Sequence, residues 1–390
     1  MEWKEVYIKD ICTVLGDGLH GTPEYDEKGD FYFINGNNLQ EGHITIKKDT
    51  KRVSQKEFLK YQKELNDRTI LVSINGTIGN VAKYNNEPCI LGKSACFFNV
   101  KEDIDRNFIY YVISSPHFKK SIIQQATGTT IKNVSLKQMR DYHFLIPVNL
   151  SDQRKIAGIL SALDSKIENN NKINANLESQ AQALFKSWFV DFTPFKDQPF
   201  VDSELGPIPQ GWKVGTLFDV ANLHDRFRRP LSSNQRSLMA KKYPYYGATS
   251  LMDFVEDYIF DGEYVLMGED GSVVTEKGYP FIQYVWGKIW VNNHAHVLSG
   301  KDGFPTELLI PFLKTYNIKG LVTGAVQAKL NQANMAQIQI PIPPKKNINN
   351  LSVIIKSIYK KYRLLTEENQ RLAALRDTLL PKLMSGEIKL

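Results

Sequence analysis

Two glycine-containing segments resemble phosphate-binding loops, and each departs from the pattern that the chemistry needs. Gly16–Gly21 (GDGLHG) has the spacing of a dinucleotide-binding loop, but Thr22 and Pro23 follow it instead of a helix whose N-terminus could hold a phosphate. Gly92–Ser94 (GKS) ends like a P-loop, but Glu87 stands where the first glycine of that loop must be. We therefore expect neither segment to bind a nucleotide.

Other catalytic and metal-binding patterns are incomplete as well. His294 and His296 alternate on an expected strand without an acidic or cysteine cluster beside them in the sequence, and two ligands alone do not close a metal shell. The chain also lacks GxSxG, HExxH and the signature of an adenine methyltransferase. We predict no catalytic residue, no metal site and no cofactor bound by this chain, which is typical of a binding and positioning protein.

Polar side chains suited to reading DNA bases gather on turn-rich stretches. Asparagine and glutamine pair with adenine through two hydrogen bonds, and arginine pairs with guanine in the same way. For each residue, a role as a hydrogen-bonded turn residue is the alternative. The candidate DNA-binding residues are Asn35, Asn37, Asn38, Gln40, Lys132, Arg226, Arg228, Arg229, Tyr245, Tyr246, Thr249 and Lys329.

Two long helices are expected to position these stretches. From Ser151, a possible N-cap, to Phe192, large or apolar residues recur at alternating steps of four and three, which is the pattern of a coiled-coil seam. The segment 347–380 repeats this spacing, and Pro381 is expected to end the second helix. Two amphipathic helices on separate cores are the alternative, but the lengths and the mid-seam asparagines favour an antiparallel pair.

The register of this pair can be predicted from its asparagines. One register places Ile156 against Leu383 and Asn170 against Asn369, so that each buried amide finds a partner. A shift of a half-heptad opposes Asn174 to Asn369 instead, and we rank it second.

An aromatic run near the end of the first long helix holds more apolar area than one seam can bury. Phe185, Trp188 and Phe189 are therefore candidates for a surface on which partner subunits dock. The alternative, that they cap the adjacent globular part, stays open.

The chain also contains an internal duplication of about 195 residues. WKEVYIKDI at Trp3 aligns with WKVGTLFDV at Trp212, and GTIGNV at Gly76 aligns with GEDGSV at Gly268. TGTTIKNVSLKQMRDYHFLIP, which begins at Thr127, aligns with TGAVQAKLNQANMAQIQIPIP, which begins at Thr323. We predict an α+β protein with approximate two-fold symmetry. Its parts are a first head at 1–150, a long helix at 151–195, a second head at 196–344 and a distal helix at 345–390.

Composition bounds the class of protein. The 42% hydrophobic and 23% charged residues are those of a soluble globular protein, and no apolar run approaches a membrane span. Three cysteines without a CxxC pair favour reduced thiols in the cytoplasm. The net charge is +7, and the excess lies on residues 345–390 rather than on either head.

With these features in this order, the chain resembles the specificity subunit of type I restriction–modification systems over its whole length. The residues that carry the resemblance are LESQAQALFKSWFVDF, DSELGPIPQGWKV, RLAALRDTLLPKLMSGEI, GDGLHGTPEY, SINGTIGNVAKY and GKIWVNNHAHVL. The resemblance implies two target recognition domains on double-stranded DNA, held apart by an antiparallel coil. It also implies two methyltransferase subunits and translocating endonuclease subunits as partners, which supply S-adenosylmethionine, ATP and Mg²⁺ chemistry.

Two other functions remain open from the sequence. One is a specificity subunit of a related system in which methylation and cleavage share one catalytic chain. The other is a non-catalytic structural spacer or RNA-binding adaptor, which salt-sensitive binding to duplex DNA would argue against.

Overall fold

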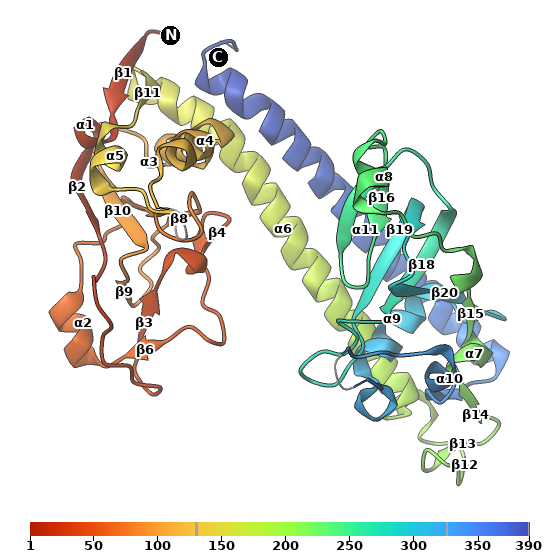
Figure 1. Ribbon diagram of the computed structural model, residues 1–390. Helices are drawn as coiled ribbons and strands as arrows, with labels where there is room; N and C mark the ends of the chain where they lie inside the picture. Colours follow the sequence, from red (N-terminus) through yellow and green to blue (C-terminus); the bar gives the residue numbers. More distant parts are fainter. Residues whose placement is uncertain (129–131, 325–326, 389) are drawn as a thin grey trace. The chain divides into compact units, whose positions relative to one another are not determined.

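The chain folds into two compact units. The structure is a computed structural model that describes residues 1–128, 132–324, 327–388 and 390 (Figure 1). Unit 1 comprises Met1–Asn169 and Glu368–Leu390, and unit 2 comprises Asn170–Glu367. Each unit therefore contains one globular part, which we call its head, and a portion of both long helices.

The head of unit 1 is built from small sheets with short helices beside them. The main sheet has the strand order β2-β10-β7-β8, a second has β6-β3-β9, and β1 pairs with β11 and β4 with β5. The strands are β1 (Trp3–Tyr7), β2 (Cys12–Asp17), β3 (Phe31–Ile34), β4 (Leu39–Gln40), β5 (His43–Ile44), β6 (Arg52–Val53), β7 (Thr69–Ser73), β8 (Val81–Lys83), β9 (Cys89–Leu91), β10 (Ala95–Val100) and β11 (His143–Pro147).

Side-chain caps mark where the short helices of unit 1 begin. Ser54, Asp105, Ser115 and Ser135 each accept a hydrogen bond from a backbone N–H in the first turn that follows. The helices are α1 (Ile8–Ile11), η1 (Gly36–Asn38), α2 (Gln55–Tyr61), α3 (Arg106–Ser114), α4 (Pro116–Gln125) and α5 (Leu136–Asp141).

The head of unit 2 repeats this plan with one larger sheet. Its strand order is β15-β20-β18-β19-β16-β17, with separate pairs β14–β21 and β12–β13. The strands are β12 (Phe200–Val201), β13 (Ile208–Pro209), β14 (Lys213–Thr216), β15 (Ala221–Leu223), β16 (Tyr243–Tyr246), β17 (Leu251–Val255), β18 (Phe260–Gly268), β19 (Ile282–Val291), β20 (Ala295–Gly300) and β21 (Gln339–Ile342). The short helices are η2 (Thr193–Phe195), α7 (Leu217–Val220), η3 (Asp225–Phe227), α8 (Ser233–Ser237), α9 (Thr306–Thr315), η4 (Lys319–Leu321) and α10 (Gln332–Met335).

Backbone bonding confirms the duplication but corrects one alignment within it. The amide of Gly76 donates to the backbone carbonyl of Lys132 at 3.2 Å, and the amide of Gly271 donates to the backbone carbonyl of Ala328 at 2.9 Å. Asn75 bridges Asn133 in unit 1 just as Asp270 bridges Lys329 in unit 2. Gly76 therefore corresponds to Gly271 and not to Gly268, because both glycines lie at left-handed φ in the same turn.

The two long helices are α6 (Leu150–Phe189) and α11 (Lys345–Met384). Helix α6 begins one residue before the predicted cap, so Ser151 lies inside its first turn. Pro381 does not end α11, which continues to Met384. A proline one turn from the end lacks only the N–H that would bond to the carbonyl of Asp377, and the last turn tolerates that loss.

Within each unit the portions of α6 and α11 pack as an antiparallel pair. In unit 1, Ile156 and Leu160 share a core with Leu380 and Leu383. In unit 2, Ala181 and Phe185 share a core with Leu351 and Ile355. The residue numbers of α11 fall as those of α6 rise, as the predicted coil requires.

Polar contacts favour the first of the two predicted registers. Arg376 donates to Asp164 at 2.7 Å in unit 1, and Asn174 donates to the hydroxyl of Thr366 at 3.1 Å in unit 2. In the first register these residues are one position from direct opposition, whereas the second would place Asn369 opposite Asn174. The predicted pair of Asn170 and Asn369 joins residues of different units and stays a prediction.

The aromatic run of α6 lies in the core of unit 2. Phe185 and Phe189 are each 3% exposed and stack at 4.7 Å between ring centroids. Phe189 also meets Trp212 edge-on at 5.6 Å, and Trp188 is half-buried against Phe195. The prediction of a docking surface on Phe185, Trp188 and Phe189 is therefore corrected, because these rings cap the second head.

Replacing Thr366 by valine will destabilise the coil portion of unit 2 by about 1–3 kcal/mol, because the buried amide of Asn174 loses its acceptor. Thr378→Val is the matched control, since the exposed Thr378 hydroxyl bonds only within its own helix, to Ala374. Urea unfolding of both variants measures the difference. Equal midpoints would contradict the assigned contact.

Candidate nucleic-acid interface

Four segments of unit 1 meet at one edge of its head, which we call the loop edge. The amide of Gly36 donates to the Ser94 hydroxyl at 2.9 Å, and Ile74 donates to the Ser94 carbonyl at 2.9 Å. The side chain of Asn75 in turn donates to that of Asn133 at 3.2 Å. These bonds join the turns after β3 and β7, the β9–β10 turn and the segment that contains Lys132.

Unit 2 has the same loop edge, built from equivalent turns. Strands β3 and β9 pair in parallel with Ile34 beside Leu91, and β16 and β19 pair in parallel with Tyr246 beside Val291. The turn that begins at Asn35 is therefore equivalent to the turn that begins at Gly247. Asn37 and Thr249 therefore lie in equivalent turns of the two heads, whereas Arg226, Arg228 and Arg229 lie in and directly after η3, which follows β15. Residues 129–131 and 325–326, within the aligned segments near Lys132 and Lys329, lie outside the described residues.

Seven of the twelve candidate DNA-binding residues are exposed. Arg226 is among them, and its guanidinium lies 4.6 Å from the ring centroid of Phe227. Lys329 approaches Glu269 at 3.9 Å while half of its side chain stays exposed. The exposed candidates are Asn37, Gln40, Lys132, Arg226, Arg229, Thr249 and Lys329.

The prediction for Asn38 is wrong, because its side-chain amide is bonded inside the head, whereas the role of the half-buried Asn35 stays a prediction. Asn38 is 4% exposed and donates to the carbonyl of Thr45 and the hydroxyl of Thr50, both at 3.0 Å. Its side-chain oxygen accepts from the amide of Asn35. The side-chain oxygen of Asn35 accepts from Ser94 at 2.9 Å. Both residues shape the turn that presents Asn37.

Tyr245 is also a structural residue rather than a contact residue. It is 1% exposed, and its hydroxyl accepts from the amide of Leu231 at 3.0 Å. Tyr246 is half-buried, and burial raises the pKa of its hydroxyl. Of this stretch, Thr249 is the candidate that reaches the surface.

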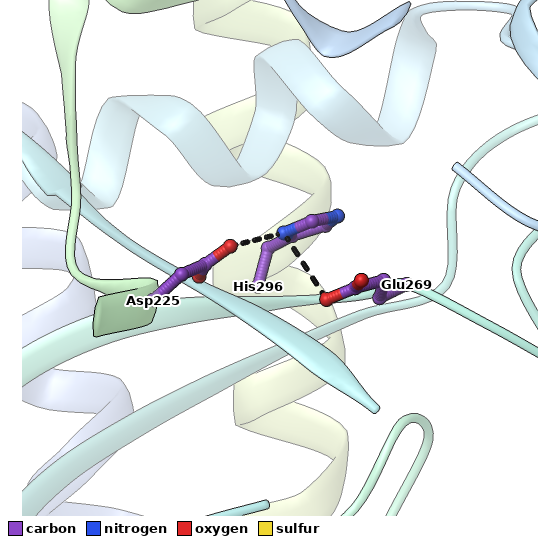
Figure 2. A group of neighbouring side chains, drawn as sticks. All are labelled: Asp225, Glu269 and His296. Atoms are coloured by element: carbon purple, nitrogen blue, oxygen red, sulfur yellow. Dashed lines mark hydrogen bonds and ion pairs between the residues drawn. The ribbon is translucent and has the colours of Figure 1, made fainter. Parts of the chain in front are cut away.

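Arg228 belongs to a nearly buried ionic group that we call the Asp225 cluster, formed by Asp225, Arg228, Glu269 and His296. Figure 2 shows His296 Nδ1 between the two carboxylates, 2.6 Å from Asp225 and 3.7 Å from Glu269. Arg228 bonds Glu269 at 2.7 Å and Asp225 at 3.2 Å, with only 11% of its side chain exposed. The prediction that Arg228 contacts DNA is therefore wrong, because its guanidinium is already paired with two carboxylates inside the protein.

Hydrogen bonds fix the orientation of the cluster. His296 Nε2 lies 2.7 Å from the carbonyl of Leu330, which can only accept, so this nitrogen carries a proton. The other oxygen of Asp225 accepts from the amide of Val297 at 3.0 Å. Burial alone would raise the pKa of Asp225, but His296, the Val297 amide and Arg228 together hold it below its usual value of 3.8.

A metal ion is the other occupant to consider, because Asp225, Glu269 and His296 offer ligand atoms within 4.8 Å of one another. Arg228 donates to the same carboxylate oxygens that a metal would use, and Gln332 donates to Asp225 at 3.1 Å. A guanidinium already supplies the positive charge that a cation would bring. We therefore interpret the cluster as a closed ionic network.

The acidic neighbours of the two histidines could not be read from the local sequence. His294 Nδ1 lies 2.5 Å from Asp270, and His296 contacts Asp225, which is 71 positions away in the chain. The absence of an acidic cluster beside these histidines in the sequence therefore does not extend to the fold, since sheet pairing brings distant carboxylates to them.

The two loop motifs fold without a phosphate cradle. Leu19 forms a parallel bridge with Gly92, and no helix follows the Gly16–Gly21 segment before β3. Gly92–Ser94 is the turn between β9 and β10 rather than the start of a helix. Among the described residues, no helix combines the length and apolar character needed to cross a membrane.

Comparison with known proteins agrees with this geometry. A family model described as the type I restriction modification DNA specificity domain matches residues 1–179 and 209–374. A putative type I restriction enzyme specificity subunit of Haemophilus influenzae is 39% identical over 148 residues, or 38% of this chain and 37% of that protein. The specificity subunit of the enzyme MjaIX from Methanocaldococcus jannaschii is 26% identical over all of this chain and 94% of its own length.

A solved structure shares the fold. The type I restriction–modification S subunit of M. genitalium superimposes with a TM-score of 0.60 at 20% identity, covering 98% of this chain and 96% of that one. Because the family model matches both halves of the duplication, the chain belongs to the family of type I restriction–modification specificity subunits.

Proposed function

We propose that this chain reads a bipartite, asymmetric DNA target with its two heads and recruits methyltransferase and endonuclease subunits to it. The observation that carries the proposal is the duplicated loop edge. The same backbone turns recur in both units, while the side chains on them differ. A shared frame with different polar residues suits two readers of different half-sites.

The exposed candidate residues of the two heads favour different base contacts. Unit 1 presents Asn37 and Gln40, whose amides suit adenine, and Lys132, which suits a phosphate. Unit 2 presents Thr249 in the equivalent turn and, from the segment after β15, Arg226 and Arg229, whose guanidinium groups suit guanine or phosphate. The proposal therefore includes a target whose halves differ in sequence.

The chain itself serves as a non-catalytic subunit in this proposal. Methyl transfer and ATP-dependent cleavage belong to the partner subunits, which bind S-adenosylmethionine, ATP and Mg²⁺. The family assignment supports this division of labour, and the Asp225 cluster is closed by Arg228 rather than open to a substrate. We also propose that the complex acts on double-stranded DNA in the cytoplasm.

Base-resolution mapping of N6-methyladenine tests the proposal. We expect co-expression of this chain with its methyltransferase subunit to methylate one target with two defined halves and a fixed spacer. The methyltransferase alone is the control and should leave the host DNA unmodified. Methylation without a bipartite consensus would reject the proposal.

Removing the side chain of Arg226 will weaken target binding by about 1–3 kcal/mol, because a base or phosphate contact of unit 2 is lost. Arg154→Ala, which removes an exposed arginine from α6, is the control of equal charge. Fluorescence anisotropy of the methyltransferase complex on its target duplex measures both. The same loss of affinity in both variants would show a general charge effect and argue against a specific contact.

A further inference from the structure

The head of unit 2 presents acidic residues to a cationic face of α11. Arg363 of α11 bonds Glu263 at 2.8 Å and approaches Glu307 at 3.7 Å, and it also bonds the Tyr284 hydroxyl. Glu307 is 4% exposed, so the head buries a carboxyl group against this helix. Lys356 and Lys360 line the same groove of about 720 Å³.

The head of unit 1 meets α6 with the opposite polarity. Asp164 of α6 accepts from the Tyr111 hydroxyl at 2.7 Å and also bonds Arg376 of α11. The head contributes Lys83, which donates to Asn107 at 3.2 Å. Burial lowers the pKa of Lys83, and the negative charges of Asp164, Asp105 and Glu168 act against that shift. Near Lys83, the charged groups of α6 are therefore the acidic Asp164 and Glu168, whereas the head offers a cation.

The two sets of residues occupy equivalent positions. Lys83 pairs with Ile70 across β7–β8, and Tyr284 pairs with Val265 across β18–β19 at the same place in the duplicated sheet. Counting back from the equivalent turns at Gly76 and Gly271 puts Arg68, which directly precedes β7, at the position of Glu263. The guanidinium of Arg68 donates to backbone carbonyls of its own head, so Lys83 is the cation that this head offers to α6.

The helix positions can be matched in the same way. Ile156 and Leu160 fill the unit 1 core as Leu351 and Ile355 fill that of unit 2, with the same spacing along the helix. This correspondence places Glu168 at the position of Arg363.

We propose that the reversed charges match each head to its own helix segment and reject the segment of the other half. The two heads share a fold and the two helices share a seam, so shape alone would permit a head to pack on either segment. A head of unit 1 on α11 would oppose Lys83 to Arg363, and like charges in a half-buried contact are unfavourable. Duplicated halves gain specificity from such a repulsive element.

The consequence is a positional rule for exchanging heads. A head can be replaced by another head from the same position. A first head placed at the second position would instead bring its positive charge against the positively charged face of α11. The rule concerns packing only and does not depend on any DNA contact, so its test is separate from that of the proposed function.

A full-length chimera tests the rule, with residues 3–149 grafted in place of 212–344. Arg363→Glu recreates at α11 the acid that Glu168 supplies in α6. We expect this substitution to raise the melting temperature of the chimera by several degrees and to lower that of the natural chain. Lys361→Glu, an equal charge change at an exposed neighbour, is the control. Its effect on the melting temperature should have the same sign in the chimera and in the natural chain.

A second pair of variants decides the matter if the chimera is insoluble with and without Arg363→Glu. In the natural chain, Glu263→Arg introduces the residue of the first head and should lower the melting temperature. Adding Arg363→Glu should restore it. The proposal is overturned if Arg363→Glu lowers the melting temperature of both the chimera and the natural chain. It is also overturned if the double variant is no more stable than Glu263→Arg alone.

Discussion

Exchanging residues 1–147 for the first head of another specificity subunit will change one half of the methylated target and leave the other half as it was. The physical reason is that each loop edge is assembled from residues of one unit. Asn37, Gln40 and Lys132 all belong to unit 1, as do the turns that hold them. Methylation of the original half-site should fall to background while a new half-site appears.

The grafted head must still pack on the retained start of α6. Ile146 in the exchanged part shares a core with Ile156 and Leu160 in the helix, so the donor needs apolar residues at the matching positions. Mapping of N6-methyladenine reads the result, and a chain with its own head re-cloned across the same junctions is the control. Changes in both half-sites would show that the heads do not read independently.

Replacing Asp225 by alanine will destabilise unit 2 by about 3–5 kcal/mol, because it removes the nearer of the two carboxylates that neutralise a buried histidine and are shared with Arg228. The main-chain amide of Val297 and the side chain of Gln332 also lose an acceptor. Asp197→Ala, at an exposed aspartate, should stay within about 0.5 kcal/mol of the natural chain. Chemical unfolding compares the two. Matching midpoints would mean that the cluster contributes nothing.

The pH dependence of Asp225→Asn follows from the direction of the pKa shift. The folded state holds the pKa of Asp225 below 3.8, so its charged form contributes stability above that pH and loses this contribution as the pH falls through the folded pKa. We expect the asparagine variant to be less stable than the natural chain at pH 6, with the gap closing below about pH 4. A gap that widens in acid would contradict the assignment.

Secondary structure could be predicted because local signals agree with the fold. Apolar residues at steps of three and four, with Asp152 in the first turn, predicted α6 to within a few residues. Ser135 caps α5 in a capping box with Gln138, and the spacing of these two residues is visible in the sequence. Pro381 was misleading because the cost of a proline depends on how much helix follows it.

The candidate site was only partly predictable, because a residue type does not fix the direction of its side chain. Asn37 and Asn38 are neighbours with the same chemistry, yet one is exposed and the other is buried in a turn of its own making. Arg228 has one partner nearby, Asp225, but its other partner Glu269 is 41 positions away, and the pairing of β18 with β20 brings Glu269 to His296. Long-range pairing of this kind leaves no local pattern.

In unit 1, residues near the end of α11 pack beside Trp3 of β1. Gly386 lies so close to Trp3 that a side chain at this glycine would meet the indole nitrogen at 2.8 Å, and Ile388 packs on the same core as Trp3. The two ends of the polypeptide are therefore neighbours, and a short peptide could join them. New ends could then open in the exposed 196–206 segment. A circularly permuted gene of this design would encode the second head first and should yield the same protein.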